Sequence, residues 1–238
     1  MKSIADLSVK IFSDAADLDD MRRAYAQPYI KGFTTNPTLM RKAGVSDYTA
    51  FAQEAIAAIP DRPISFEVFS DDFNEMERQA RTIAAWGENV YVKIPVTNTR
   101  AESSAALVRR LSQDGVKLNV TALMTLDQVQ EILNAVSGGA AACISVFAGR
   151  IADTGNDPVP MMSDAVQMLS GVPGTELIWA SPRELLNIFQ ADEIGCHIIT
   201  VTHDILKKLP LVGRDLRDFS LDTVKMFHGD AAQAGYTL

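Results

Sequence analysis

Short apolar runs alternate along the chain with segments that carry apolar residues at three- and four-residue spacing. The runs have the length of buried β-strands and cover residues 9–14, 30–36, 64–70, 90–96, 116–123, 141–149, 176–181 and 196–202. Helical spacing is found between most of them, at residues 48–59, 73–86, 103–112, 126–136 and 159–169. Eight strands that alternate with helices predict a parallel sheet, and a closed (β/α)₈ barrel best fits 238 residues.

The boundaries of the helical segments carry residues that commonly cap helices. Ser181 followed by Pro182 predicts an N-cap and a first-turn proline. Four further polar residues stand where N-caps are expected, namely Asp47, Asp72, Thr125 and Asp157. These signals support the assignment of helices between the strands.

The whole chain, residues 1–238, is expected to form one barrel domain, because no Pro/Gly/Ser-rich linker or change in composition divides it. Residues 215–238 follow the eighth strand and predict a C-terminal helical extension of one or two helices, with Phe219, Val224, Met226 and Phe227 as apolar contacts. A doubly wound open sheet is the main competing fold, but the first strand is not followed by Gly-x-Gly-x-x-Gly.

The charge and the cysteine content exclude several classes of function. A net charge of −8 argues against nucleic-acid binding, and no apolar run is long enough for a signal peptide or a membrane span. Cys143 and Cys196 lie in apolar runs and are interpreted as core residues in a reducing compartment, so a cytoplasmic location is expected. The three histidines lack ligand spacing, and no metal site is expected.

Lys93 is a cation in the middle of the apolar run 90–96. A buried ammonium group is costly, and burial favours the neutral amine, which is the nucleophile of Schiff-base enzymes. A strand-end lysine whose ammonium group reaches water is the alternative interpretation.

Polar residues interrupt or close most of the apolar runs, and a barrel places its chemistry at the carboxyl ends of its strands. We therefore expect these side chains to converge on one mouth: Asp14, Thr34, Thr35, Asn36, Glu67, Lys93, Asn119, Thr121, Ser145, Arg150, Ser181 and Arg183. Two guanidinium groups in an acidic protein predict a local site for an anionic ligand.

Several of these residues occur in motifs that resemble those of the transaldolase family. Residues 32–38, Gly-Phe-Thr-Thr-Asn-Pro-Thr, are similar to the family signature, and residues 92–97, Val-Lys-Ile-Pro-Val-Thr, are similar to its Schiff-base lysine motif. Asp14, the Asn-x-Thr at 119–121 and the Ser-x-Arg at 181–183 match in the same order. The resemblance extends from about residue 14 to residue 202, in a family that also contains fructose-6-phosphate aldolases.

The resemblance implies an enzyme of carbohydrate metabolism on a (β/α)₈ barrel without a cofactor. Such an enzyme transfers a dihydroxyacetone unit from a ketose phosphate, sedoheptulose 7-phosphate or fructose 6-phosphate, to an aldose phosphate. It also implies a homo-oligomer, a decamer or a pentamer, in which a C-terminal helix reaches a neighbouring subunit.

The resemblance also implies the roles of individual residues. Lys93 would form the imine, Asp14 would act as general base, and Glu67 with Thr121 would hold a water that shuttles protons. The substrate would be bound by Thr34, Asn36, Asn119 and Ser145 around the three-carbon fragment, by Phe147 beside it, and by Arg150, Ser181 and Arg183 at the phosphate.

Four alternatives remain open at the level of sequence. One is an aldolase that releases free dihydroxyacetone, but such relatives carry Gln and Tyr where this chain has Glu67 and Phe147. A transaldolase for a modified sugar phosphate or sulfonate is another, since Asn98-Thr99-Arg100 and Pro182 depart from the family pattern. The others are a barrel isomerase or epimerase, and a catalytically silent protein that binds sugar phosphates.

Overall fold

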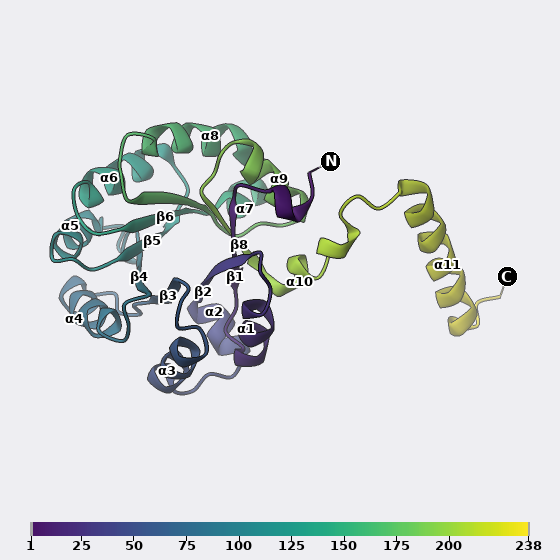
Figure 1. The fold of residues 1–238 in the computed structure, drawn as a ribbon, viewed down its shortest axis with the longest axis horizontal. Coiled ribbons are helices and arrows are strands. Elements are labelled where there is room, and N and C mark those ends of the chain that lie inside the picture. The colour runs from purple at the N-terminus through teal and green to yellow at the C-terminus, as the bar shows by residue number, and fades with distance from the viewer. Residues whose placement is uncertain (1, 238) are drawn as a thin grey trace.

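A closed barrel of parallel strands forms the body of the protein in the computed structural model, which describes residues 2–237 (Figure 1). The strands follow one another in chain order, and β8 pairs with β1 to close the sheet. They are β1 (Lys10–Asp14), β2 (Ile30–Thr34), β3 (Ile64–Glu67), β4 (Val90–Pro95), β5 (Leu118–Leu123), β6 (Ala142–Val146), β7 (Thr175–Trp179) and β8 (Ile198–Thr202). The predicted barrel is confirmed, and the open-sheet alternative is wrong.

Helices lie around the outside of the barrel and cover the strands (Figure 1). They are α1 (Leu18–Tyr25), α2 (Pro37–Lys42), α3 (Tyr48–Ala58), α4 (Phe73–Ala84), α5 (Ala105–Gln113), α6 (Leu126–Val136), α7 (Ala148–Asp153), α8 (Pro158–Leu169), α9 (Leu186–Glu193) and α10 (His203–Leu206). The last helix, α11 (Leu216–Ala234), lies away from the barrel. The predicted caps of α3, α4, α6 and α8 are confirmed, because each side chain accepts a backbone N–H of the first turn: Asp47, Asp72, Thr125 and Asp157.

Most strands end earlier than the apolar pattern predicted. The run 30–36 ends as a strand at Thr34, and Asn36 is the N-cap of α2 instead. Similarly, β6 ends at Val146, so that Gly149 belongs to α7. Apolar character continues past the strand ends because these residues still pack at the top of the barrel, where strands turn into helices.

The lower interior of the barrel is filled by a small apolar cluster. It contains Phe12, Cys143, Ile178 and Ile198, all nearly inaccessible to water. A Cβ atom at Gly32 would lie 2.5 Å from the ring of Phe12, so only glycine fits on β2 at this point. The cluster closes the barrel beneath the polar residues of the upper layer.

Both cysteines are buried in the barrel and its surroundings, as the sequence predicted. Burial raises the pKa of Cys143 and of Cys196 to about 12, so both thiols stay protonated. Within residues 2–237, no group of three or more His, Cys, Asp and Glu side chains has the arrangement of a metal site. No helix in the same range is long and apolar enough to cross a membrane.

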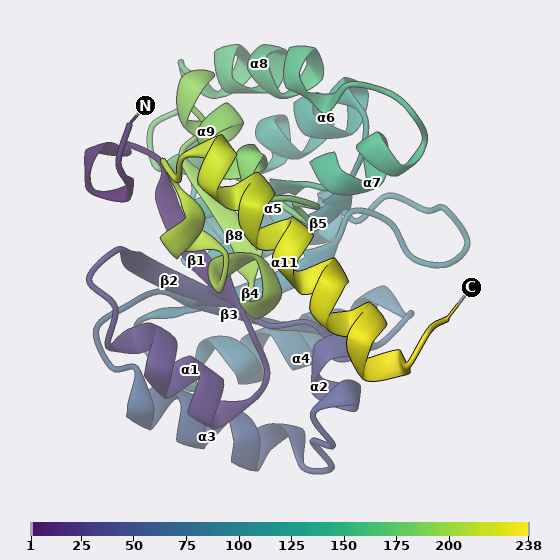
Figure 2. The ribbon, with the colours of Figure 1, turned by 90° about the vertical axis from the view of Figure 1, so that its right-hand side faces the viewer.

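The C-terminal helix α11 stands apart from the barrel in Figure 1 and crosses in front of it in the turned view of Figure 2. Asp215 caps its first turn, as expected for an independent helix. None of its 19 residues is buried within the described chain, and Phe219 and Phe227 are 42% and 63% exposed. The extension is therefore a single helix, and the four residues predicted as apolar contacts, Phe219, Val224, Met226 and Phe227, are not buried within the described chain.

Candidate active site

A cavity of about 660 Å³ opens at the carboxyl ends of the strands. The structure brings to it all the predicted residues except Thr35 and Asn119: Asp14, Thr34, Asn36, Glu67, Lys93, Thr121, Ser145, Phe147, Arg150, Ser181 and Arg183. The Thr35 hydroxyl instead donates to the Ser65 carbonyl oxygen at 2.8 Å. Titratable, amide and hydroxyl groups from all eight strands or the turns after them thus meet in one place.

Lys93 lies on β4 with only 6% of its surface exposed. Parallel pairing sets Lys93 directly beside Glu67 of β3, and Nζ lies 3.2 Å from Oε2 of that carboxylate. The amine also donates to the carbonyl oxygen of Thr35 at 3.1 Å. The amine of Lys93 is therefore buried at the cavity wall, between a carboxylate and a backbone carbonyl group.

Asp14 ends β1 and faces Lys93 across the cavity floor. Thr34 donates its hydroxyl to the carboxylate at 2.8 Å, and the side-chain amide of Asn36 donates to it at 3.3 Å. Burial raises the pKa of Asp14 above its usual value, although Lys93, Thr34 and Asn36 act in the opposite direction. A carboxylate with a raised pKa is a better proton acceptor near neutral pH.

Asn36 has two tasks that its position explains. Its Oδ1 accepts the N–H of Leu39 at 2.9 Å and caps α2, while its Nδ2 points to Asp14. Pro37 occupies the first turn of this short helix, where a missing N–H costs nothing. The cap and the proline therefore fix the amide in place beside the carboxylate.

Asn119 lies below the cavity and is fully buried on β5. Its Nδ2 donates to the Ser65 hydroxyl at 3.0 Å, and its Oδ1 accepts the Ser145 hydroxyl at 2.7 Å. Ser65 was missed by the sequence analysis, although it also interrupts its apolar run. It lies two residues before Glu67, and this alternation was a usable signal, because side chains at i and i+2 share a face.

Thr121 lies at a bulge in β5, where the register with β6 shifts between Val120 and Leu123. Ala122 has a φ of 67°, which is uncommon for a residue with a side chain. Thr121 lines the cavity, and its buried hydroxyl has no hydrogen-bond partner among the described residues. The bulge thus leaves an unpaired hydroxyl in the wall of the cavity.

Thr200 of β8 is a second residue that the sequence analysis missed. Its hydroxyl shares a short hydrogen bond with that of Thr34 and lines the same cavity. Thr202, two residues later, also lines it. The strand run 196–202 had been treated as apolar, although its alternate positions carry these hydroxyls.

The outer part of the cavity carries the two predicted arginines. Arg183 makes two hydrogen bonds to Asp153, with Nε 2.9 Å from Oδ1 and Nη2 bound to Oδ2. The guanidinium of Arg150 lies over the Phe147 ring at 5.5 Å, a cation–π distance. Both arginines line the cavity, whereas Asp153 does not.

Ser181 does not cap a helix, so this prediction is wrong. Its φ is 59°, and α9 begins only at Leu186. The side chain of Asn187 instead accepts the backbone N–H of Arg183 at 2.8 Å. The turn is packed on Gly149 of α7, where a Cβ atom would lie 1.5 Å from the carbonyl oxygen of Ser181.

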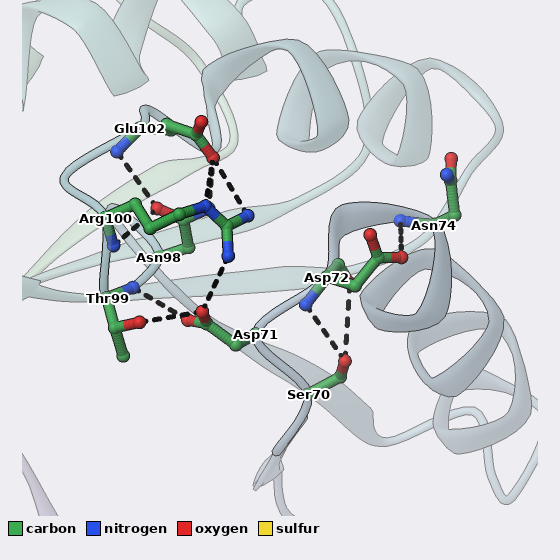
Figure 3. A network of polar contacts seen from close by, with 8 residues as sticks. All are labelled: Ser70, Asp71, Asp72, Asn74, Asn98, Thr99, Arg100 and Glu102. Atoms are coloured by element: carbon green, nitrogen blue, oxygen red, sulfur yellow. Dashed lines mark hydrogen bonds and ion pairs between the residues drawn. The ribbon is translucent and has the colours of Figure 1, made fainter.

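The unusual segment after the lysine strand forms a closed polar network outside the cavity (Figure 3). Asp71 accepts the N–H and the hydroxyl of Thr99, both at 2.7 Å, and Arg100 at 3.2 Å. Arg100 also binds Glu102, and the network joins the loops that follow β3 and β4. Of the two departures from the family pattern, only Pro182 lines the cavity.

The chain is similar to known proteins over most of its length. The profile of the family described as Transaldolase/Fructose-6-phosphate aldolase matches residues 11–236. A "Probable transaldolase" from Dehalococcoides mccartyi is 35% identical over 90% of this chain and 97% of its own length. A second "Probable transaldolase", from Thermoanaerobacter sp. (strain X514), is 38% identical over 91% of this chain and 95% of its own.

Solved structures share the barrel at much lower identity. A 2,3-dimethylmalate lyase superposes with a TM-score of 0.58 at 13% identity, over 98% of this chain and 86% of that one. Dihydrodipicolinate synthase from Rhodopseudomonas palustris gives a TM-score of 0.55 at 16% identity, over 93% and 80% of the two chains. These likenesses concern the fold alone.

Proposed function

Because this chain belongs to the transaldolase/fructose-6-phosphate aldolase family, we propose that it is a transaldolase that works through a lysine Schiff base. It transfers a dihydroxyacetone unit from a ketose phosphate, sedoheptulose 7-phosphate or fructose 6-phosphate, to an aldose phosphate. The observation that carries this proposal is the buried Lys93 amine, 3.2 Å from the Glu67 carboxylate in a cavity lined by two arginines.

Formation of the imine begins when the neutral amine of Lys93 attacks the C2 carbonyl of the ketose. Glu67 takes the proton that the ammonium group releases, since no other carboxylate among the described residues pairs with Lys93. Water then leaves C2, and the Thr121 hydroxyl, free of protein partners, is suited to hold the leaving or attacking water beside Glu67. The product is a protonated imine, which is an electron sink.

Cleavage of the C3–C4 bond requires a base at the C4 hydroxyl. Asp14 takes this proton, and the C3–C4 electron pair moves towards the imine, so that an aldehyde leaves and a three-carbon enamine remains on Lys93. The enamine then attacks the carbonyl of an incoming aldose, Asp14 returns the proton, and hydrolysis of the imine frees the new ketose. The raised pKa of Asp14 fits a group that alternates between base and acid.

The three-carbon unit is held by short polar side chains. Asn36, Thr34 and Ser145 line the cavity near Lys93 and are suited to bind its hydroxyl groups. Asn119, which hydrogen-bonds Ser65 and Ser145, serves to orient the Ser145 hydroxyl. Arg150, Ser181 and Arg183 bind the phosphate at the outer end.

Transfer, not release, is favoured by the residue beside the enamine. Phe147 lines the cavity without a hydroxyl that could protonate the enamine or activate water. The enamine therefore persists until an aldehyde arrives.

Free thiols at Cys143 and Cys196 fit a reducing compartment, the cytoplasm.

The protein acts as a homo-oligomer, a decamer or a pentamer, in which α11 packs against a neighbouring subunit. This proposal rests on the apolar residues of α11, which are exposed in the single chain and include Leu216, Phe219, Val224 and Phe227. An isolated helix gains little stability from its own sequence, so a partner surface accounts for its presence. Light scattering coupled to size exclusion measures the assembly.

Chemical trapping tests the proposed function. Borohydride with fructose 6-phosphate should attach a reduced three-carbon fragment to the peptide that contains Lys93. Lys93→Arg keeps the charge but cannot form the imine, so it should abolish both trapping and turnover. Lys10→Arg is the matched control, because Lys10 begins β1 at the opposite end of the barrel. Trapping on another lysine, or on none with any ketose donor, would overturn the assignment.

A further inference from the structure

A carboxylate that the proposed reaction does not use contacts Arg183 at the outer end of the cavity. Asp153 is the last residue of α7, one helical turn after Arg150, and it binds the guanidinium of Arg183 through both carboxylate oxygens. It does not line the cavity, so it stands behind the arginine and not in the path of a ligand. We call Arg150, Ser181 and Arg183 the anion cradle.

The hydrogen-bond inventory of Arg183 shows what this contact does. A guanidinium has five N–H groups, and Asp153 accepts from Nε and from Nη2. The Nη1 group and the second hydrogen of Nη2 remain available, and they form the edge that can bind two oxygens of one anion. The carboxylate therefore fixes the arginine with its free edge at the cavity.

The same carboxylate also changes the charge of the cradle. Arg150 and Arg183 bring two positive charges, and Asp153 offsets one of them. Hydrogen bonding and attraction from Arg183, with a contribution from Arg150, hold the pKa of Asp153 below its usual range, so it stays ionised at neutral pH. Lys42 of α2 is a further cation on the cavity lining.

We propose that Asp153 sets the charge preference of the cradle, so that a singly charged terminal group, such as a sulfonate, is accepted alongside a phosphate dianion. This inference rests on the proposed function, because it assigns the cradle to the terminal anion of the sugar. A cradle with two uncompensated arginines would favour the dianion strongly. Asp153 reduces this advantage while it keeps Arg183 in position.

The expected size follows from Coulomb's law. The lost charge of Asp153→Asn lies roughly 7 Å from a bound anion, the span of a guanidinium with a hydrogen bond on each side. For a half-exposed pair with an effective dielectric constant between about 40 and 80, the ratio of dianion to monoanion affinity rises about 3- to 8-fold.

The test measures binding of two ligands that differ only in terminal charge. A hexitol 6-phosphate is mainly a dianion at pH 7.5, since the second pKa of a phosphate ester is about 6, and its 6-sulfonate isostere carries one charge. Neither has a carbonyl group, so no imine forms with Lys93. Calorimetric dissociation constants for the unaltered protein, Asp153→Asn and Asp153→Glu give the affinity ratio for each.

Asp153→Asn should raise the phosphate-to-sulfonate ratio, and Asp153→Glu, which keeps the charge, should stay near the ratio of the unaltered protein. Asp164→Asn is the matched control, because it removes the same charge from an exposed position on α8 that does not line the cavity. An unchanged ratio in Asp153→Asn, an equal loss of both ligands, or no binding of either would overturn the inference. Trapping at Lys93 is independent of this outcome, so the two proposals fail separately.

Discussion

Gly149 on α7 offers a sharp test of how the anion cradle is assembled. An ideal Cβ atom at this residue would lie 1.5 Å from the carbonyl oxygen of Ser181 and 2.6 Å from its carbonyl carbon. Carbon atoms of this kind essentially never approach below 3.0 Å. Gly149→Ala must therefore move the Ser181 turn and α7 apart by about 1.5 Å or more, because both contacts involve backbone and not a flexible side chain.

The displacement separates Arg150 from Ser181 and Arg183, the three residues to which we assign the terminal anion of the donor. Loss of one charge-assisted hydrogen bond, about 1.5–3 kcal/mol, corresponds to about a 10- to 150-fold weaker binding of phosphorylated donors. An unphosphorylated ketose does not use the cradle and should lose much less. The expected result is thus a selective rise in KM for fructose 6-phosphate relative to fructose.

Stability gives an independent readout of the same change. In an unhindered helix, Gly→Ala stabilises by about 1 kcal/mol, whereas overpacking costs about 1–3 kcal/mol. Gly149→Ala should therefore lower the melting temperature by a few degrees. Gly171→Ala is the control, since nothing lies within 4 Å of its Cβ position.

Steady-state kinetics with the two donors and thermal unfolding of both variants complete the experiment. Equal losses on phosphorylated and unphosphorylated donors would show that Gly149 supports the fold and not the cradle. Unchanged kinetics with a raised melting temperature would refute the steric argument altogether.

Three further predictions concern other parts of the chain. Asp14→Asn should lower kcat about 10²- to 10⁴-fold. Because burial raises the pKa of Asp14, the acid limb of the pH–rate profile of the unaltered protein should lie above the ordinary aspartate range. An acid limb at about pH 4 would contradict this. Phe147→Tyr should increase release of free dihydroxyacetone relative to transfer to erythrose 4-phosphate, and the idea fails if the unaltered protein already releases it as fast as it transfers it. Asp192→Asn should lower the free energy of unfolding, measured in urea, by about 2 kcal/mol. Asp192 is buried and accepts hydrogen bonds from Lys2 and from the amides of Val9 and Ser8. These contacts outweigh the cost of burial and lower the pKa of Asp192. This contribution should be present above about pH 4 and be lost as the pH falls through the depressed pKa; a variant with the same acid sensitivity as the unaltered protein would contradict it.

Much of the fold follows from the sequence because it depends on local periodicity. Apolar runs and helical spacing identified all eight strands and five of the helices. The helix caps could also be predicted, because a side-chain oxygen before a helix satisfies the first-turn amides wherever that helix packs. The shorter helices α2, α7 and α10 escaped detection, because four to six residues are too few to display a period. The sequence also indicated Lys93 as the candidate reacting group, since a lysine inside an apolar run is unusual in any fold.

The tertiary structure decided how these groups act on one another. The distance between Lys93 and Glu67 depends on the register between β3 and β4. The apolar pattern shows which face of each strand is buried, but it does not show which residues of the two strands pair. Left-handed backbone at Ser181 and Ala122 has no sequence signature, because neither residue is glycine and only the surrounding packing holds them there.

Contacts between distant segments were likewise beyond the sequence. Asp153 binds Arg183, which lies thirty residues further along the chain. Only the packing of α7 against the turn at Ser181 brings the two side chains together. The helical pattern of α11 is encoded locally, but the structure shows that none of its residues is buried within the described chain. Local patterns therefore determined the elements and the reacting groups, whereas three-dimensional packing determined their distances, their charges and their partners, because those quantities depend on residues far apart in the chain.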